Sequence, residues 1–74
     1  MSMGEIRVTS PLLGTVIAVH ATVGSAVAAG KDLIVIESMK MEIPVISEVA
    51  GKIVRLAVTQ GDVVQEGDLI IEIG

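Results

Sequence analysis

Short runs of aliphatic residues, separated by glycine and by polar positions, make up most of this 74-residue chain. Ile6 and Val8 alternate with polar neighbours, which is the pattern of a half-buried strand. Further strands are expected over residues 15–20, 25–29, 33–37, 42–47, 51–58 and 69–73, and within residues 61–67. The strands near residues 25–29 and 61–67 are expected to be brief, because glycines bracket both passages.

The composition of the chain favours an all-β fold. Val, Ile and Leu number 12, 10 and 5, whereas Phe, Tyr and Trp are absent, and β-branched residues favour strands. Eight glycines indicate many turns. No cysteine is present, so neither a disulfide nor a thiolate metal site can reinforce the core. We therefore expect one small domain over residues 1–74, built as an all-β barrel or sandwich.

A fixed distance of 37 residues relates the two parts of the chain. The residues it aligns are Gly14 with Gly51, Gly24 with Gly61, Gly30 with Gly67, Glu5 with Glu42, Ile6 with Ile43, Val8 with Val45, Ser10 with Ser47, Thr22 with Thr59 and Val27 with Val64. Self-similarity at one period indicates a duplication, so we expect repeat halves over residues 5–37 and 42–74. The predicted fold is a flattened eight-stranded barrel, or barrel-sandwich hybrid, of two pseudo-twofold-related four-stranded halves.

The link between the two halves is the stretch Glu37-Ser38-Met39-Lys40-Met41-Glu42. It reverses the chain over about four residues between two predicted strands, yet its centre has no Gly, Asn or Asp. Tight hairpin turns require positive φ at their central positions, which costs about 1 kcal/mol or more for an ordinary residue. The sequence therefore indicates that these side chains are kept for a function. Because this link has no internal copy, we expect it at one end of the barrel and the chain termini at the other.

The charge and hydropathy of the chain argue against several classes of function. The net charge of −4, the missing aromatic residues and the lack of a basic cluster disfavour nucleic-acid binding. No apolar run approaches the ~20 residues that cross a bilayer, and residues 1–5 show no signal-peptide pattern. We therefore expect a soluble cytoplasmic protein with neither a nucleic-acid nor a membrane partner.

Candidate catalytic residues are few. The single histidine, His20, lies at the end of a predicted strand without an obvious carboxylate partner, and we interpret it as a surface residue. Glu37 and Glu42 flank the same turn and could act as a carboxylate pair, but we interpret them as solvated charges. The glycine-bounded passages lack the pattern of a phosphate-binding loop. The chain is therefore predicted to be non-catalytic, with no metal site.

Lys40 is the remaining candidate for chemistry, since Lys31 and Lys52 can be interpreted as ordinary surface charges. A lysine in water is almost fully protonated at neutral pH, so a dedicated enzyme is needed to make it a nucleophile. An amine on a long stem at a hairpin tip suits the covalent attachment of a group that moves between sites, and Met39 and Met41 offer a partner flexible apolar contacts. Alternatively, Lys40 only keeps the turn soluble while both methionines pack on the barrel rim. The residues alone leave both interpretations open.

The stretch Glu37-Ser38-Met39-Lys40-Met41 resembles the Glu-Ala/Ser-Met-Lys-Met signature of biotinyl (biotin carboxyl carrier) domains. The resemblance covers nearly the whole chain through the glycines, the strand spacing and the duplication. It implies that biotin–protein ligase attaches biotin to Lys40 as an amide, with Met39 and Met41 as recognition flanks. It also implies that a biotin carboxylase carboxylates the biotin using bicarbonate and ATP, and that a carboxyltransferase passes the carboxyl group to an acyl-CoA or a keto acid.

Some positions depart from the family pattern. Ser38 stands where many relatives have Ala, and Leu12-Leu13-Gly14 stands where many have Met-Pro-Gly. Carriers of many bacterial acetyl-CoA carboxylases have a protruding thumb between their second and third strands. About five residues separate His20 from Ala26, which leaves no room for a thumb. The chain thus looks like the thumbless carriers of propionyl-CoA, methylcrotonyl-CoA or pyruvate carboxylases and of decarboxylases, and like small freestanding biotin/lipoyl attachment proteins.

Two other functions are compatible with the pattern. Lipoyl domains share the duplicated barrel and its hairpin lysine, so a lipoyl carrier with lipoate on Lys40 is the alternative. Those domains typically have Asp or another polar residue before the lysine and often Ala after it, so Met39 and Met41 favour biotin. The third possibility is an unmodified binding or assembly module that uses the barrel surface.

Overall fold

The computed structural model describes residues 5–74, which form eight strands and no helix. The strands are β1 (Ile6–Thr9), β2 (Gly14–Val19), β3 (Ala26–Val27), β4 (Asp32–Ser38), β5 (Met41–Ile46), β6 (Gly51–Leu56), β7 (Val63–Val64) and β8 (Leu69–Ile73). They follow the predicted order, and the all-β class is confirmed. β3 and β7 are shorter than predicted, and β6 ends at Leu56 rather than Val58 because the chain turns there toward β7.

Two expectations from the sequence concern a membrane-spanning segment and a signal peptide. The described residues contain no helix that is long and apolar enough to cross a membrane. The expected lack of a signal peptide concerns the start of the chain, and residues 1–4 lie outside the described part.

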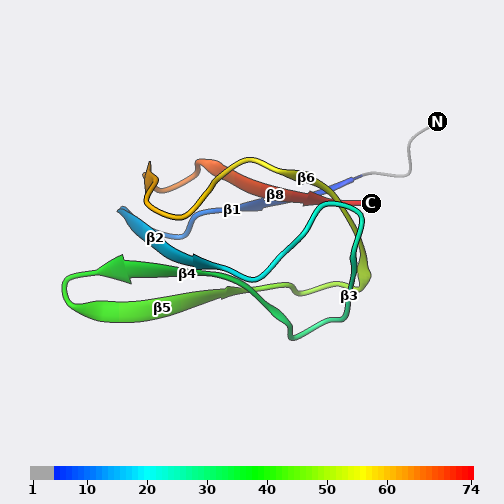
Figure 1. The fold of residues 1–74 in the computed structure, drawn as a ribbon, viewed down its shortest axis with the longest axis horizontal. Helices are drawn as coiled ribbons and strands as arrows, with labels where there is room; N and C mark the ends of the chain where they lie inside the picture. The colour runs from blue at the N-terminus through cyan, green and yellow to red at the C-terminus, as the bar shows by residue number, and fades with distance from the viewer. Residues whose placement is uncertain (1–4) are drawn as a thin grey trace.

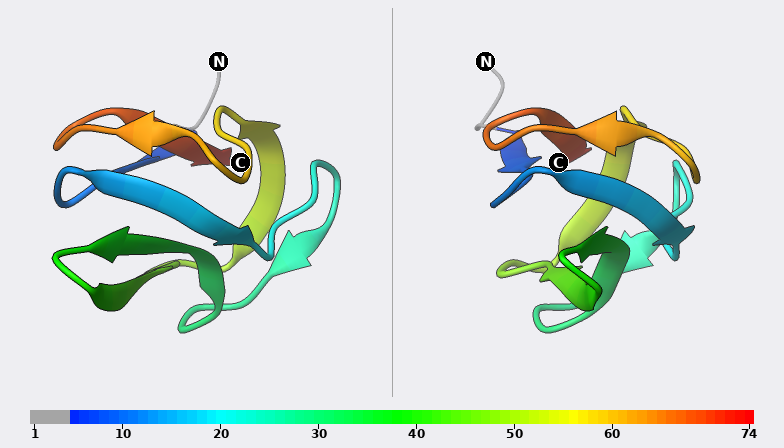
Figure 2. Two further views of the ribbon diagram at one scale, coloured as in Figure 1. Left: turned by 60° about the vertical axis from the view of Figure 1, so that its left-hand side comes forward. Right: turned by 90° about the vertical axis from the view of Figure 1, so that its left-hand side faces the viewer.

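The eight strands form two antiparallel sheets, with the orders β1-β8-β6-β3 and β5-β4-β2-β7 (Figure 1, Figure 2). Replacing each strand by its counterpart 37 residues away converts one order into the other. Each sheet therefore takes two strands from each half of the chain, and neither half has a sheet of its own. The sequence predicted a flattened barrel with pseudo-twofold symmetry, but not this exchange of strands between the halves.

Aliphatic side chains fill the space between the two sheets. The 37-residue shift matches several of them in pairs, all with at most 2% of their surface exposed: Val16 with Ile53, Leu33 with Ile70, Ile34 with Ile71 and Ile36 with Ile73. Burying one such side chain stabilises the fold by roughly 1.5–3 kcal/mol. The two halves therefore contribute to the core through equivalent positions.

Two buried serines make equivalent hydrogen bonds in the two halves. Ser10 Oγ donates to the carbonyl of Leu12 at 2.7 Å, and Ser47 Oγ donates to the carbonyl of Val49 at 2.6 Å. A buried hydroxyl destabilises a protein unless it is hydrogen-bonded, so each serine is satisfied within its own loop. These loops lead into β2 and β6, and the same side-chain bond shapes both of them.

The β4–β5 hairpin lies at one end of the elongated molecule, and Gly74 and the start of β1 lie at the opposite end (Figure 1). Symmetry explains this arrangement, which the sequence predicted. The cross-strand pair Ile36–Ile43 below the hairpin corresponds to the pair Ile6–Ile73, beyond which the chain ends. The hairpin and the two ends of the described chain thus occupy equivalent places at opposite ends of the molecule.

Candidate functional site

Two residues, Met39 and Lys40, make the whole turn between β4 and β5. Pairing of the two strands continues up to Ser38 and Met41, so the reversal is shorter than the four or so residues predicted. Met39 has a φ of 53° and Lys40 a φ of 65°, and no other non-glycine residue in the described part of the chain has a positive φ. A left-handed backbone costs roughly 1–2 kcal/mol for such a residue. The backbone strain is therefore concentrated in the lysine turn, where the sequence predicted it.

The side chains of the turn point into solvent. Met39 is 91% exposed and Met41 is 63% exposed, which does not fit methionines that pack on the barrel rim. Lys40 is also exposed. Within residues 5–74 the one ion pair joins Arg7 Nε to Glu72 Oε2 at 4.0 Å, so no acidic side chain there holds the Lys40 amine. An accessible, unpaired amine is what amide attachment of a carboxyl-bearing cofactor requires.

Glu37 and Glu42 are direct cross-strand partners immediately below the turn. Both side chains are exposed, because the neighbouring Ile36 faces the core and side chains alternate along a strand. Like charges that face each other across two strands destabilise a hairpin, so stability does not account for this pair. Sequence reasoning placed both residues beside the turn but missed their direct pairing. The turn length is the signal that would have shown it, since a two-residue turn places these positions opposite each other.

His20 lies away from the hairpin. It follows β2, which begins at Gly14 near the hairpin and runs toward the other end of the molecule (Figure 1). Its side chain is exposed, and its backbone N–H donates to the carbonyl of Leu33 at 2.8 Å. The structure therefore does not bring His20 together with Lys40 or with the glutamate pair. Among residues 5–74, no group of three or more His, Asp or Glu side chains is arranged to hold a metal ion.

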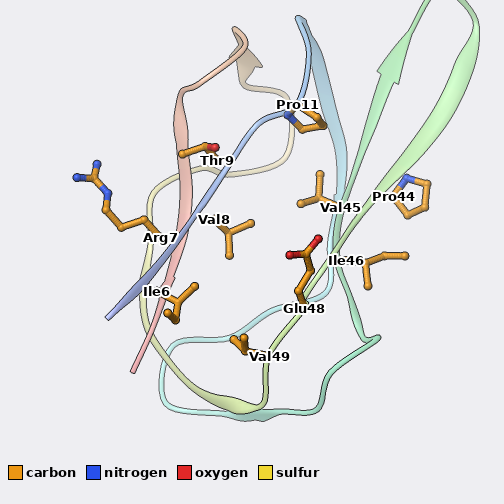
Figure 3. A pocket seen from close by; sticks show the side chains of 10 residues that line it. All are labelled: Ile6, Arg7, Val8, Thr9, Pro11, Pro44, Val45, Ile46, Glu48 and Val49. Carbon is orange, nitrogen blue, oxygen red and sulfur yellow. The ribbon is translucent and has the colours of Figure 1, made fainter. Parts of the chain in front are cut away.

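An open groove of about 610 Å³ lies between β1 and β5, which are each an edge strand of one of the two sheets (Figure 3). Its walls are mainly aliphatic, with Val8 and Val45 on opposite sides. The Arg7 side chain extends away from the groove, whereas Glu48 leans into it (Figure 3). Residues 39–41 are not part of its lining, so the groove is separate from the lysine turn.

Comparisons with known proteins match almost the whole chain. Residues 6–73 match the biotin/lipoyl family model described as "Biotin-requiring enzyme". The chain is 43% identical over 63 residues to a biotinylated protein TB7.3 homolog of Mycobacterium leprae, covering 85% of this chain and 89% of that protein. It is 33% identical over 68 residues to a biotin/lipoyl attachment protein of Bacillus subtilis, covering 92% and 93% of the two chains. It is also 41% identical over 64 residues to the human propionyl-CoA carboxylase alpha chain, covering 86% of this chain but 9% of that one.

Solved structures of two kinds have this fold. A urea carboxylase of Kluyveromyces lactis superposes with a TM-score of 0.90 and 32% identity, over 100% of this chain and 6% of the carboxylase chain. The lipoyl domain of the 2-oxoglutarate dehydrogenase complex of Azotobacter vinelandii superposes with a TM-score of 0.80 and 28% identity, over 93% and 95% of the two chains. The chain therefore spans most of some relatives and a small part of the carboxylases.

A flattened barrel of two interleaved sheets, with an exposed lysine turn opposite its termini, defines a carrier domain for a covalently attached cofactor. The chain belongs to the biotin/lipoyl attachment family. Such domains carry their cofactor and are not themselves catalysts, which agrees with the prediction of a non-catalytic chain.

Proposed function

We propose that this chain is the biotin carrier domain of a biotin-dependent carboxylase, and that Lys40 is its attachment residue. The observation that supports Lys40 most directly is the left-handed two-residue turn that presents it beside exposed Met39 and Met41. The match to the biotin-requiring family and the similarity to a biotinylated protein and to carboxylase chains support the cofactor.

The hairpin has the physical properties that a carrier requires. β4 and β5 are seven and six residues long and hold the turn on a rigid base at the end of the barrel. The Lys40 side chain adds a flexible stem, and its amine becomes a neutral amide when it is acylated. Met39 and Met41 give apolar contacts to the proteins that must handle this stem. When bound, biotin supplies the group that accepts and gives up a carboxyl group.

The partners that follow from this function are a biotin–protein ligase, a biotin carboxylase and a carboxyltransferase that acts on an acyl-CoA or a keto acid. The net charge of −4 supports protein partners rather than nucleic acid, and we include no membrane partner in the proposal. The sequence contains no cysteine, which is compatible with a reducing compartment, and we place the carrier in the cytoplasm.

Lipoate is the alternative group for Lys40, because a lipoyl domain has the same fold. The lipoyl domain of the 2-oxoglutarate dehydrogenase complex is 28% identical to this chain, whereas the biotinylated protein TB7.3 homolog of Mycobacterium leprae is 43% identical. The methionines on both sides of Lys40 also resemble biotin carriers more than lipoyl domains. Biotin is therefore the better supported cofactor.

The test is intact-mass analysis of the protein purified from its native host, together with avidin capture. Biotin and lipoate add different masses, so the mass identifies the group, and an unchanged mass would mean that no group is attached. We expect the mass of one biotin, lost completely in Lys40→Arg, because an arginine keeps the charge but cannot form this amide. The matched control is Lys52→Arg, an exposed lysine elsewhere, which should remain modified. Avidin capture that survives Lys40→Arg would exclude Lys40 as the site.

A further inference from the structure

The sulfur-containing side chains of this molecule are gathered at one place. The sequence has no cysteine and four methionines, of which Met39 and Met41 lie within residues 5–74. These two flank Lys40 directly, and their side chains are 91% and 63% exposed. The described part of the chain therefore presents all of its sulfur to solvent, on the two sides of one lysine.

The core of the barrel between residues 5 and 74 has no sulfur for an oxidant to attack. Its buried hydrophobic side chains are alanine, valine, leucine and isoleucine, which do not react readily with peroxides. The sequence also lacks tryptophan and tyrosine. Methionine oxidation usually damages a protein because the polar sulfoxide disrupts a packed core. Here the sulfoxides would lie outside the core, so oxidation leaves the packing of the barrel unchanged.

The geometry of the hairpin explains why neither thioether is shielded. Met39 lies in the left-handed turn, with a φ of 53°. Met41 is on the same face of β5 as Val45, because side chains alternate along a strand. Val45 is buried, whereas Met41 stays exposed because the hairpin projects beyond the neighbouring strands (Figure 1). Both sulfur atoms are accessible, and the more exposed Met39 should be oxidised faster than Met41.

Building on the function proposed above, we propose that Met39 and Met41 form an oxidation site that controls the modification of Lys40. The oxidant is a hydroperoxide, of which hydrogen peroxide is the simplest. The thioether sulfur attacks one peroxide oxygen, so that an S–O bond forms while the O–O bond breaks. The proton of the transferred oxygen moves to the departing oxygen, which leaves as water. The sulfur loses two electrons and the peroxide gains two.

The sulfoxide changes the character of the lysine turn without changing its fold. A thioether is a flexible apolar group, whereas a sulfoxide is polar and has an oxygen that accepts hydrogen bonds. A ligase site that fits the two apolar side chains would have to remove water from both S–O groups, which weakens binding. Methionine sulfoxide reductases reverse the change, because two thiols give the thioether, a disulfide and water. The site therefore turns modification of Lys40 down under oxidation and restores it afterwards.

The first experiment locates the oxidation in the unmodified full-length chain. The protein is treated with hydrogen peroxide, the excess is destroyed with catalase, and the protein is digested with trypsin. Cleavage after lysine and arginine places Met39 in the peptide 32–40, Met41 in the peptide 41–52 and the other two methionines in the peptide 1–7. We expect the peptides 32–40 and 41–52 each to gain the mass of one oxygen atom, the former faster.

The second experiment measures biotinylation of the treated protein by purified ligase with ATP and biotin. We expect oxidation to raise KM about tenfold, since a few apolar side chains dominate most interfaces. The melting temperature should stay near that of the untreated protein. Treatment with methionine sulfoxide reductases of both stereospecificities should return KM to its starting value.

The matched control is Met39→Leu/Met41→Leu, which keeps apolar side chains beside Lys40 but cannot be oxidised there. It retains Met1 and Met3, so it also reports any effect of oxidation at those positions. Each protein is compared with its own untreated sample, which removes the effect of leucine itself. Peroxide should leave KM of this variant unchanged.

Three results would refute the oxidation site while leaving the carrier function intact. They are the absence of added oxygen at Met39 and Met41, an unchanged KM after oxidation, and an equal rise of KM in the leucine variant. A loss of modification that accompanies a fall in melting temperature would also refute it, because the effect would then come from unfolding. An untreated wild-type protein that the ligase does not modify at Lys40 would instead refute the carrier function itself.

Discussion

Met39 and Lys40 adopt left-handed backbone conformations, with positive φ, which glycine, asparagine or aspartate adopts in most two-residue hairpins. Neither side chain compensates for this strain by packing, because both are exposed. The glutamate pair below the turn adds repulsion. Two features, the strained backbone and the charge repulsion, therefore lower stability at one place, and both lie next to the amine that the proposed function uses.

The exposure of the two methionines leads to a prediction about Met39→Gln/Met41→Gln. Surface substitutions usually change stability by less than about 0.5 kcal/mol each, so the two together should shift the melting temperature by at most about 8 °C. Modification of Lys40 should nevertheless slow down, because glutamine loses the apolar contact. Differential scanning calorimetry and a ligase time course measure the two effects. A large fall in melting temperature with normal modification would instead indicate that the methionines pack in the folded protein.

At the scale of elements, the β4–β5 hairpin consists of two paired strands and a strained tip formed by Met39 and Lys40. Replacing the tip by Met39→Asn/Lys40→Gly supplies the residues that a turn with two positive φ values favours. We expect a gain of about 1–2 kcal/mol from relief of the left-handed strain, which corresponds to roughly 4–16 °C in melting temperature for a domain of this size. Thermal unfolding checks this, and avidin capture should be abolished.

The control for the hairpin substitution is Lys40→Arg, which removes the attachment site and keeps the strain. Its melting temperature should remain near that of the unmodified wild type. If the Asn-Gly hairpin is no more stable than Lys40→Arg, the turn stores no usable strain, and the unusual residues at its tip need another physical explanation.

The two turns that contain Gly24 and Gly61 test whether the halves are equivalent elements. Their φ values are 93° and 98°, and an added Cβ at either site would meet no atom within 4 Å. Valine at either position therefore adds conformational strain without a clash, and each substitution should destabilise by at least about 1 kcal/mol. Chemical denaturation of Gly24→Val and Gly61→Val should give similar losses, while Gln60→Val at the preceding position of the second turn, which does not have a positive φ, should cause a much smaller change. Clearly unequal losses would contradict equivalence of the two turns.

At the scale of the whole molecule, local patterns predicted the strands and the lysine turn but not how the strands associate. Alternation and glycine spacing are properties of neighbouring residues, so they place β2, β4 and β5 within a residue or two. The pairs β1–β8 and β3–β6 join segments far apart in the sequence, and no local pattern specifies such partners. The repeat constrained the answer to a symmetric one, and the structure shows that strands are exchanged between the halves.

The candidate site was predictable in part for the same reason. Lys40, Met39 and Met41 are adjacent in the sequence, and their unusual turn chemistry is visible without a structure. The direct pairing of Glu37 with Glu42 was missed because it depends on the length of the turn, and the sequence pattern did not show that the turn has only two residues.

The hairpin and the two ends of the described chain, Glu5 and Gly74, occupy equivalent places, so the path of the chain through the two sheets is nearly symmetric and is broken only between Gly74 and Glu5. The chain can therefore be circularly permuted. Joining its ends by a short linker and opening the Lys40 turn would keep all strand pairs but remove the turn that presents the attachment lysine. Joining the ends by a copy of Ser-Met-Lys-Met would instead give a barrel with a lysine turn at each of its two ends. In the natural connectivity Gly74 lies at the end of the barrel away from Lys40, so a polypeptide fused beyond Gly74 leaves the barrel at the end remote from the attachment residue.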